Sequence, residues 1–249
     1  MLRFAGIFSV LMVISACSWP GVRGPADGNR VFAGRMLSEI IAANRDLGPF
    51  KGLGNIRIRY GETILSARSA WIADPQGLRL RIEIMGPGGR PAARLVANGS
   101  MAFFSRYDHG SLFSRRLSER SLNSLVHIPI KVNEFILFLA GSIPVQPYDD
   151  FLVRCTVNSD RQVVFLKKKW HGIVEKIGFI PGKSVVTDVE VYGWFGSRFR
   201  VDMVTPPETE TALPVMIFSH GDVSVRIEPE RQWRDISIPA GAFDMPRPE

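Results

Sequence analysis

The chain has 249 residues and carries 31 lysines and arginines against 24 acidic residues, which gives a formal net charge of +7. This length suits one sizeable domain, and the chain contains no internal repeat or low-complexity block. The positive charge bears on solubility and on association with anionic surfaces, not on fold. Only two cysteines are present, and because Cys17 is assigned below to another role, an intramolecular disulfide is excluded.

The N-terminus has the three parts of a secretory signal. Arg3 precedes an apolar run from Phe4 to Ile14, and two small residues follow before Cys17. That run is shorter than the roughly 20 residues that cross a bilayer as a helix. The segment Ile14–Cys17 resembles the bacterial lipobox, which implies acylation of Cys17 and removal of residues 1–16. The alternative is an ordinary secretory signal with a cysteine nearby by chance.

The residues after Cys17 indicate where the mature chain goes. In lipoproteins of two-membrane bacteria the next residue directs sorting, and the resemblance implies that Ser18 favours the outer membrane. Stable anchoring requires more than one acyl chain, which a triacylated cysteine provides. Residues 17–29 are rich in proline and glycine and are interpreted as a lipidated flexible tether. The folded domain is expected to span residues 30–249.

The folded part begins with one predicted helix and continues in strands. An amphipathic helix is expected from about Arg30 to Arg45, with Phe32, Met36 and Ile40 on one side. Beyond it, apolar and polar residues alternate in short runs separated by turn signals, as in strands that bury one face. We expect about ten or eleven strands between residues 50 and 238. The clearest runs are 56–60, 78–84, 188–191, 199–203 and 223–227.

A second helix is predicted from about Asn133 to Ala140. It is apolar almost all the way round and must therefore be enclosed by other elements. The concave side of one strongly curved sheet is the simplest enclosure. The predicted fold is mainly β: a single curved antiparallel sheet forming an incomplete β-barrel, with short helices plugging the hollow.

Such a fold leaves room for an apolar cavity, although the same side chains could instead pack solidly; the sequence leaves both possibilities open. Candidate cavity residues come from the inward faces of one strand and of the enclosed helix. They are Leu80, Ile82, Ile84, Phe135, Phe138 and Leu139.

Two segments resemble the LolA/LolB-like lipoprotein-handling proteins, most closely the LolB-type outer-membrane receptors. One is Arg79–Gly89, which looks like the strand and Pro-Leu-Gly loop of those receptors. The other runs from Ile128 through the apolar helix to Pro144. The resemblance implies a half-open barrel that accepts acyl chains. It also implies a membrane-facing loop at Pro87, Gly88 and Gly89, in which Gly88 replaces the exposed leucine of the receptors.

Signals of catalysis are absent from the sequence. The four histidines have no metal-ligand spacing, and no nucleophile elbow or phosphate-binding loop occurs. The adjacent pair Asp149 and Asp150 is expected to serve a turn or the start of a strand. Cys155 is expected to be a buried, inert thiol. We therefore expect no enzyme, no catalytic residue, no metal site and no cofactor.

The leading hypothesis is an outer-membrane lipoprotein, facing the periplasm, that holds acyl chains of a lipid or lipoprotein and takes part in lipoprotein localisation. Its expected partners are those acyl chains, the inner leaflet of the outer membrane, and a periplasmic carrier or envelope complex, but not nucleic acid. The basic run Lys167–Lys169 could contact anionic headgroups or could be a solvated strand end. The alternative hypothesis is a structural or assembly lipoprotein that kept the fold without transport.

Overall fold

The computed structural model describes residues 27–99, 101–107, 111–116, 121–123, 127–155, 160–181, 185–205 and 213–244. The predicted signal peptide, Cys17 and Ser18 lie outside these residues. Within the described ranges, no helix is long and apolar enough to cross a membrane.

Thirteen strands among the described residues form one antiparallel sheet. They are β1 (Phe50–Tyr60), β2 (Thr63–Asp74), β3 (Arg79–Met85), β4 (Pro91–Asn98), β5 (Met101–Arg106), β6 (Ser111–Arg116), β7 (Asp150–Cys155), β8 (Gln162–Lys168), β9 (Gly172–Ile180), β10 (Val185–Gly193), β11 (Gly196–Val204), β12 (Val215–His220) and β13 (Val223–Arg234). Two meanders, β1 to β6 and β7 to β13, are joined where β1 pairs with β13, for example Phe50 with Arg234. The edge strands are β6 and β7, so the sheet stays open.

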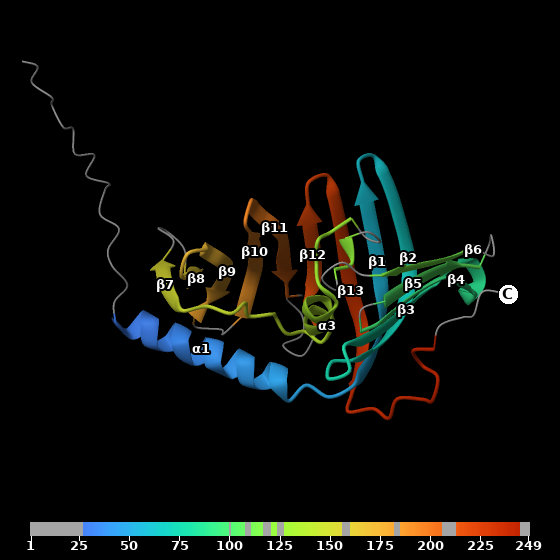
Figure 1. The fold of residues 1–249 in the computed structure, drawn as a ribbon, viewed down its shortest axis with the longest axis horizontal. Helices are drawn as coiled ribbons and strands as arrows, with labels where there is room; N and C mark the ends of the chain where they lie inside the picture. The colour runs from blue at the N-terminus through green and yellow to red at the C-terminus, as the bar shows by residue number, and fades with distance from the viewer. Residues whose placement is uncertain are drawn as a thin grey trace, which may run out of the picture.

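The predicted fold class is confirmed, and the sheet has more strands than expected. The five runs singled out in the sequence lie in strands, except that Leu78, with a φ of +51°, belongs to the turn before β3. Short strands such as β5 lack the expected alternation, because Ala102, Phe103 and Phe104 form a continuous apolar run. Periodicity cannot identify a run of that kind as a strand. Strong right-handed twist turns β3 to β6 nearly across β10 to β13 (Figure 1).

Two α-helices and one short 3-10 turn accompany the sheet in the described residues. Helix α1 (Asp27–Arg45) lies along one end of β7 to β12, and helix α3 (Val132–Leu139) lies against the concave face near β12 and β13 (Figure 1). The 3-10 turn η1 (Pro87–Gly89) connects β3 to β4. Because α1 begins at Asp27, its first three residues belong to the span that the sequence assigned to the tether.

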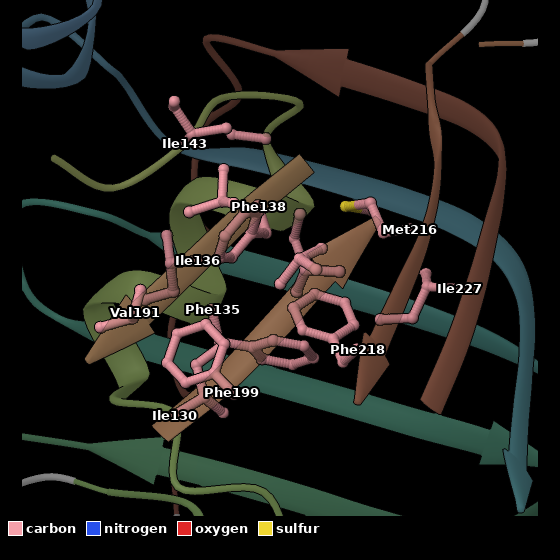
Figure 2. Close-up of a cluster of buried hydrophobic side chains, with 14 of the residues drawn as sticks. Ile130, Phe135, Ile136, Phe138, Ile143, Val191, Phe199, Met216, Phe218 and Ile227 are labelled. Carbon is pink, nitrogen blue, oxygen red and sulfur yellow. The ribbon is translucent and has the colours of Figure 1, made fainter. Parts of the chain in front are cut away.

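Helix α3 plugs the hollow of the sheet, as expected. Its residues Phe135 and Phe138 meet Phe218 edge-on, with ring centroids 5.4 and 5.3 Å apart, and Phe138 also meets Phe199 at 6.5 Å (Figure 2). Edge-to-face pairs of this kind add about 0.5–1.5 kcal/mol each to the burial of the rings. The last turn of α3 is held from β13, where Gln232 and Arg234 donate to the carbonyls of Leu139 and Ala140. The helix is therefore an integral part of the core.

Candidate functional site

Five of the six side chains predicted to line a cavity are brought together in the core around α3, and the exception is Ile84. Leu80, Phe138 and Leu139 are fully buried, Ile82 and Phe135 are nearly so, and Ile84 is half-buried. All except Ile84 belong to one continuous core cluster. Since α3 occupies the centre of the hollow, open volume lies elsewhere on the concave side, and the role of these six residues in binding stays a prediction.

A cavity of about 380 Å³ lies between α1, the exit of α3 and the adjacent ends of β10, β11 and β12. Its volume falls within the range of small-molecule sites. The lining is mixed, because four polar residues join the apolar side chains and contribute about as much of its surface. The lining residues are Phe32, Arg35, Met36, Glu39, Ile40, Gly141, Ser142, Ile143, Val185, Val186, Met203, Thr205 and Pro214.

The apolar stripe of α1 forms one wall of this cavity. Phe32, Met36 and Ile40 are spaced three to four residues apart, so they lie on one side of the helix. Phe32 stacks on Phe179 of β9 with ring centroids 5.9 Å apart, which fixes that side of the helix against the sheet. The exposed Arg35 and Glu39 form an ion pair across one turn, 3.9 Å between Nε and Oε1. This exposed charged pair thus lies beside the apolar stripe in the cavity wall.

Polar contacts at both ends hold α1 over the cavity. At its start, Arg30 Nη2 lies 2.8 Å from Asp150 Oδ1, and Asn29 Nδ2 donates to Cys155 Sγ at 3.3 Å. At its end, Asn44 Nδ2 donates to the carbonyl of Ile143 at 2.8 Å. The Arg30–Asp150 pair is about half exposed, and exposed pairs contribute at most about 1 kcal/mol. The helix start is therefore tied more weakly than α3.

The expectation that Cys155 is buried is wrong. Its thiol is exposed, because Cys155 is the last residue of β7, which is an edge strand of the sheet that the described residues form. The adjacent pair Asp149 and Asp150 was expected to serve a turn or a strand start, and the two side chains have different partners. Asp150 pairs with Arg30, while Asp149 Oδ2 accepts a hydrogen bond from the backbone N–H of Lys169 at 2.6 Å. Asp149 thereby supports the β8–β9 turn.

A buried polar network lies beside α3. The carboxylate of Glu134 accepts from the Lys131 N–H at 2.8 Å and from Gln146 Nε2 at 2.9 Å, and it pairs with Arg198 at 3.3 Å. Glu175, on the concave face of β9, is also fully buried. Its Oε2 accepts from the Gln146 N–H at 2.8 Å, and its Oε1 has no hydrogen-bond partner in the described part of the chain.

Burial, with a smaller contribution from the nearby charge of Glu134, raises the pKa of Glu175 to about 8 despite the hydrogen bond from Gln146. Near neutral pH this carboxyl is therefore mostly protonated in the folded protein. A neutral carboxyl avoids much of the penalty of burying a charge without a cationic partner.

The loop that corresponds to the membrane-facing loop of the resembled receptors is exposed. Pro87, Gly88 and Gly89 all reach solvent, and a Cβ atom added at Gly88 would meet nothing within 4 Å. Gly88 has a φ of +75°, a left-handed conformation that glycine adopts without strain. Apart from the ring of Pro87, the loop presents no apolar side chain.

The sequence identified the apolar side of α1 but did not assign it to a cavity. Hydrophobic periodicity shows that Phe32, Met36 and Ile40 must be covered, and it does not show which strands cover them. The aromatic residues Trp170, Trp194 and Phe195 were also missed. Their signal was present, because large aromatic residues stood in turns between alternating strands, where they cannot reach a core.

The chain matches no protein-family model and no curated protein. Solved structures do resemble its fold. A DUF1329 family protein from Desulfovibrio piger matches 89% of this chain and 98% of its own with a TM-score of 0.54 at 10% identity. A LolA superfamily protein from Nitrosomonas europaea matches 86% of this chain and 97% of its own with a TM-score of 0.51 at 11% identity. The chain therefore has the open, mainly β fold of these proteins.

Proposed function

We propose that the protein is an outer-membrane lipoprotein that holds an acyl chain of a lipid or lipoprotein in the cavity beneath α1. The observation that carries this proposal is the cavity itself, which has one apolar wall on α1 and an exposed charged pair beside it. An amphipathic molecule matches that arrangement, with its chain against Met36, Val186 and Met203 and its polar end near Arg35 and Glu39. The fold shared with a LolA superfamily protein supports the proposal.

Binding in this mechanism is by burial, and no covalent bond is made or broken, so we propose no catalytic role. Each Å² of apolar surface removed from water contributes about 25 cal/mol. A chain lying on the wall of α1 is held by that contribution alone. It is released when the bilayer offers equal burial, which suits a role in lipoprotein or lipid localisation.

The location of the protein is part of the same proposal. Residues 1–16 would be removed as a signal peptide, Cys17 would be acylated, and Ser18 would direct the protein to the outer membrane, facing the periplasm. A relationship to the LolB-type receptors in particular is also proposed, on the two sequence segments that resemble them. Labelling cells with radioactive palmitate tests the anchor: label should enter the protein and should be lost in the Cys17→Ala variant.

Acyl binding is tested with Ser18–Glu249, which contains every helix and strand described. Circular dichroism first establishes that this fragment is folded. A fluorescent fatty acid is then titrated into the parent and into Val186→Trp, which adds a large ring to the cavity. We expect the variant to bind the probe at least about tenfold more weakly, since a factor of ten corresponds to about 1.4 kcal/mol.

A matched control is available on the other face of the sheet. A groove of about 360 Å³ there is lined by Leu53, Ile72 and Trp233 among others. Leu53→Trp adds an equal ring at that groove and should leave probe binding unchanged. If the parent binds no acyl probe, or if both variants bind like the parent, the cavity is not an acyl site.

One observation favours the alternative, a structural or assembly lipoprotein of an envelope complex. The exposed loop at Gly88 presents only the ring of Pro87 to a membrane, so it lacks the leucine that the resembled receptors use. Affinity purification of the anchored protein from cells distinguishes the two functions. Recovery of a defined envelope protein in fixed proportion, together with absence of acyl binding, would support the assembly role.

A further inference from the structure

Three of the most exposed large apolar side chains in the described residues lie at the tips of two adjacent hairpins. Trp170, in the β8–β9 turn, is 90% exposed, and Trp194 and Phe195, which form the β10–β11 turn, are 76% and 106% exposed. Strands β9 and β10 are neighbours in the sheet, so the two tips lie side by side. The ring of His171 bridges them, with its centroid 4.1 Å from that of Trp194.

Backbone contacts hold the Trp170 tip in place. The Lys169 N–H donates to Asp149, and the His171 N–H donates to the Lys168 carbonyl at 3.0 Å. Trp170 itself has a φ of +67°, a region that a bulky residue occupies only with strain. The chain therefore maintains a strained backbone to present a tryptophan to water, and strain of this kind is typical of functional sites.

The same edge of the sheet carries further apolar side chains. Antiparallel order places the turns at residues 61–62, 169–171, 194–195 and 221–222 at one end of the strands, and Figure 1 shows the hairpins of β1–β2, β10–β11 and β12–β13 rising on one side. We call this the hairpin edge. Of the ten exposed large hydrophobic residues in the described ranges, six lie on it: Tyr60, Ile64, Leu65, Trp170, Trp194 and Phe195.

Positive charge borders the aromatic tips. Lys168 and Lys169 are exposed and Lys167 is half-buried, and Lys169 Nζ lies 5.9 Å from the centre of the Trp170 ring. Two carboxylates lie beside this run: Asp149 accepts from the Lys169 N–H, and Asp150, opposite Lys167 in the ladder, pairs with Arg30. Within the described residues these three lysines form no ion pair, so their ammonium groups can meet anions beside the aromatic tips.

We propose that the hairpin edge docks onto an anionic phospholipid surface, with the rings of Trp170, Trp194 and Phe195 entering the headgroup region. Tryptophan is enriched where membrane meets water, and neighbouring lysines are attracted to anionic headgroups. The lysines beside the tips complement the negative charge of anionic headgroups, and this favours lipid as the partner. The edge would replace the Gly88 loop as the membrane contact.

This docking does not depend on acyl binding. The cavity lining residues Val186, Met203 and Pro214 lie at the opposite ends of β10, β11 and β12 from the hairpin edge. Substitutions at the edge should therefore leave the acyl probe titration unchanged. The acyl probe titration and the vesicle assay can therefore fail independently, and each failure contradicts only its own proposal.

The test is sedimentation of Ser18–Glu249 with vesicles of phosphatidylethanolamine, with and without phosphatidylglycerol. The tip variant carries Trp170→Ser, Trp194→Ser and Phe195→Ser. We expect it to bind phosphatidylglycerol-containing vesicles at least about tenfold more weakly, because three exposed rings lose their burial in lipid. Replacing Lys167, Lys168 and Lys169 with glutamine should remove the preference for phosphatidylglycerol and the sensitivity to salt.

The control variant carries Val204→Ser and Trp233→Ser, two exposed apolar residues at the far ends of β11 and β13. It should bind vesicles like the parent, and all variants should unfold at the parent's denaturant midpoint. Bromine-labelled lipids provide a second readout, since they should quench tryptophan fluorescence in the parent but not in the tip variant. Equal binding by parent and tip variant, or no binding by the parent, overturns the proposal. If the tip variant instead loses an envelope protein that co-purifies with the parent, the hairpin edge is a surface for protein docking.

Discussion

The buried carboxyl of Glu175 makes the stability of the protein depend on pH in a way that can be measured at one residue. The perturbation is Glu175→Gln, which keeps the size of the side chain and removes its ionisation. Burial, together with the charge of Glu134, raises the pKa of Glu175 from an ordinary value of 4.5 to about 8 in the folded protein. A difference of that size between folded and unfolded states corresponds to about 5 kcal/mol.

The direction of the effect follows from which state holds the proton. Below about pH 4.5 the carboxyl is protonated in both states and contributes no pH dependence. Between about pH 4.5 and 8 the unfolded chain releases the proton while the folded protein keeps it, so stability falls as pH rises. Well above pH 8 the carboxyl is ionised in both states, and the stability no longer falls because of Glu175. Glutamine cannot ionise, and the variant should therefore lack this decrease.

The assay is guanidinium unfolding of Ser18–Glu249 at a series of pH values from acid to alkaline. The quantity of interest is the free energy of unfolding of Glu175→Gln minus that of the parent, because other carboxyls cancel in the difference. We expect this difference to be smallest near pH 4 and to increase to several kcal/mol by pH 9.

Glu62→Gln, which removes one exposed carboxylate in the β1–β2 turn, is the matched control. Its difference from the parent should stay within about 0.5 kcal/mol at every pH, as for surface substitutions in general. A Glu175→Gln difference that is constant from acid to alkaline pH would refute the reasoning, since Glu175 would then ionise equally in both states.

Three further changes test the core, the polar network and the cover of the cavity. Phe138→Ala removes a fully buried ring from α3 and should lower the free energy of unfolding by about 3–5 kcal/mol in denaturant titration; a loss below 1 kcal/mol would mean that α3 is not packed as described. Arg198→Met leaves the buried Glu134 carboxylate without its cation and should cost about 3–5 kcal/mol by the same assay, with Arg57→Met, on the exposed face of β1, as its near-neutral control. Asn29→Cys stands next to the native Cys155, so oxidation should join α1 to β7 and slow the release of a bound acyl probe in stopped-flow fluorescence, and dithiothreitol should restore it. Equal release rates in both redox states, with the disulfide verified by mass spectrometry, would show that the start of α1 does not move during release.

The sequence by itself determined the class of the fold and the kind of each major element. Alternation in runs such as residues 223–227 specifies both the strand and its buried face, because side chains on a strand point to opposite sides in turn. The all-round apolar character of residues 133–140 required an enclosed helix, since no solvent-facing side is available. These are local properties, and they were predicted correctly from neighbouring residues alone.

The tertiary structure alone decided which elements meet. Glu134 and Glu175 are 41 positions apart, and their proximity depends on where α3 enters the sheet. Phe32 meets Phe179, and Phe50 pairs with Arg234, only after long-range strand pairing has set the order of the sheet. Periodicity carries no information on that order. For this reason the cavity beneath α1 and the adjacent tips of Trp170 and Trp194 could be located only in the folded protein.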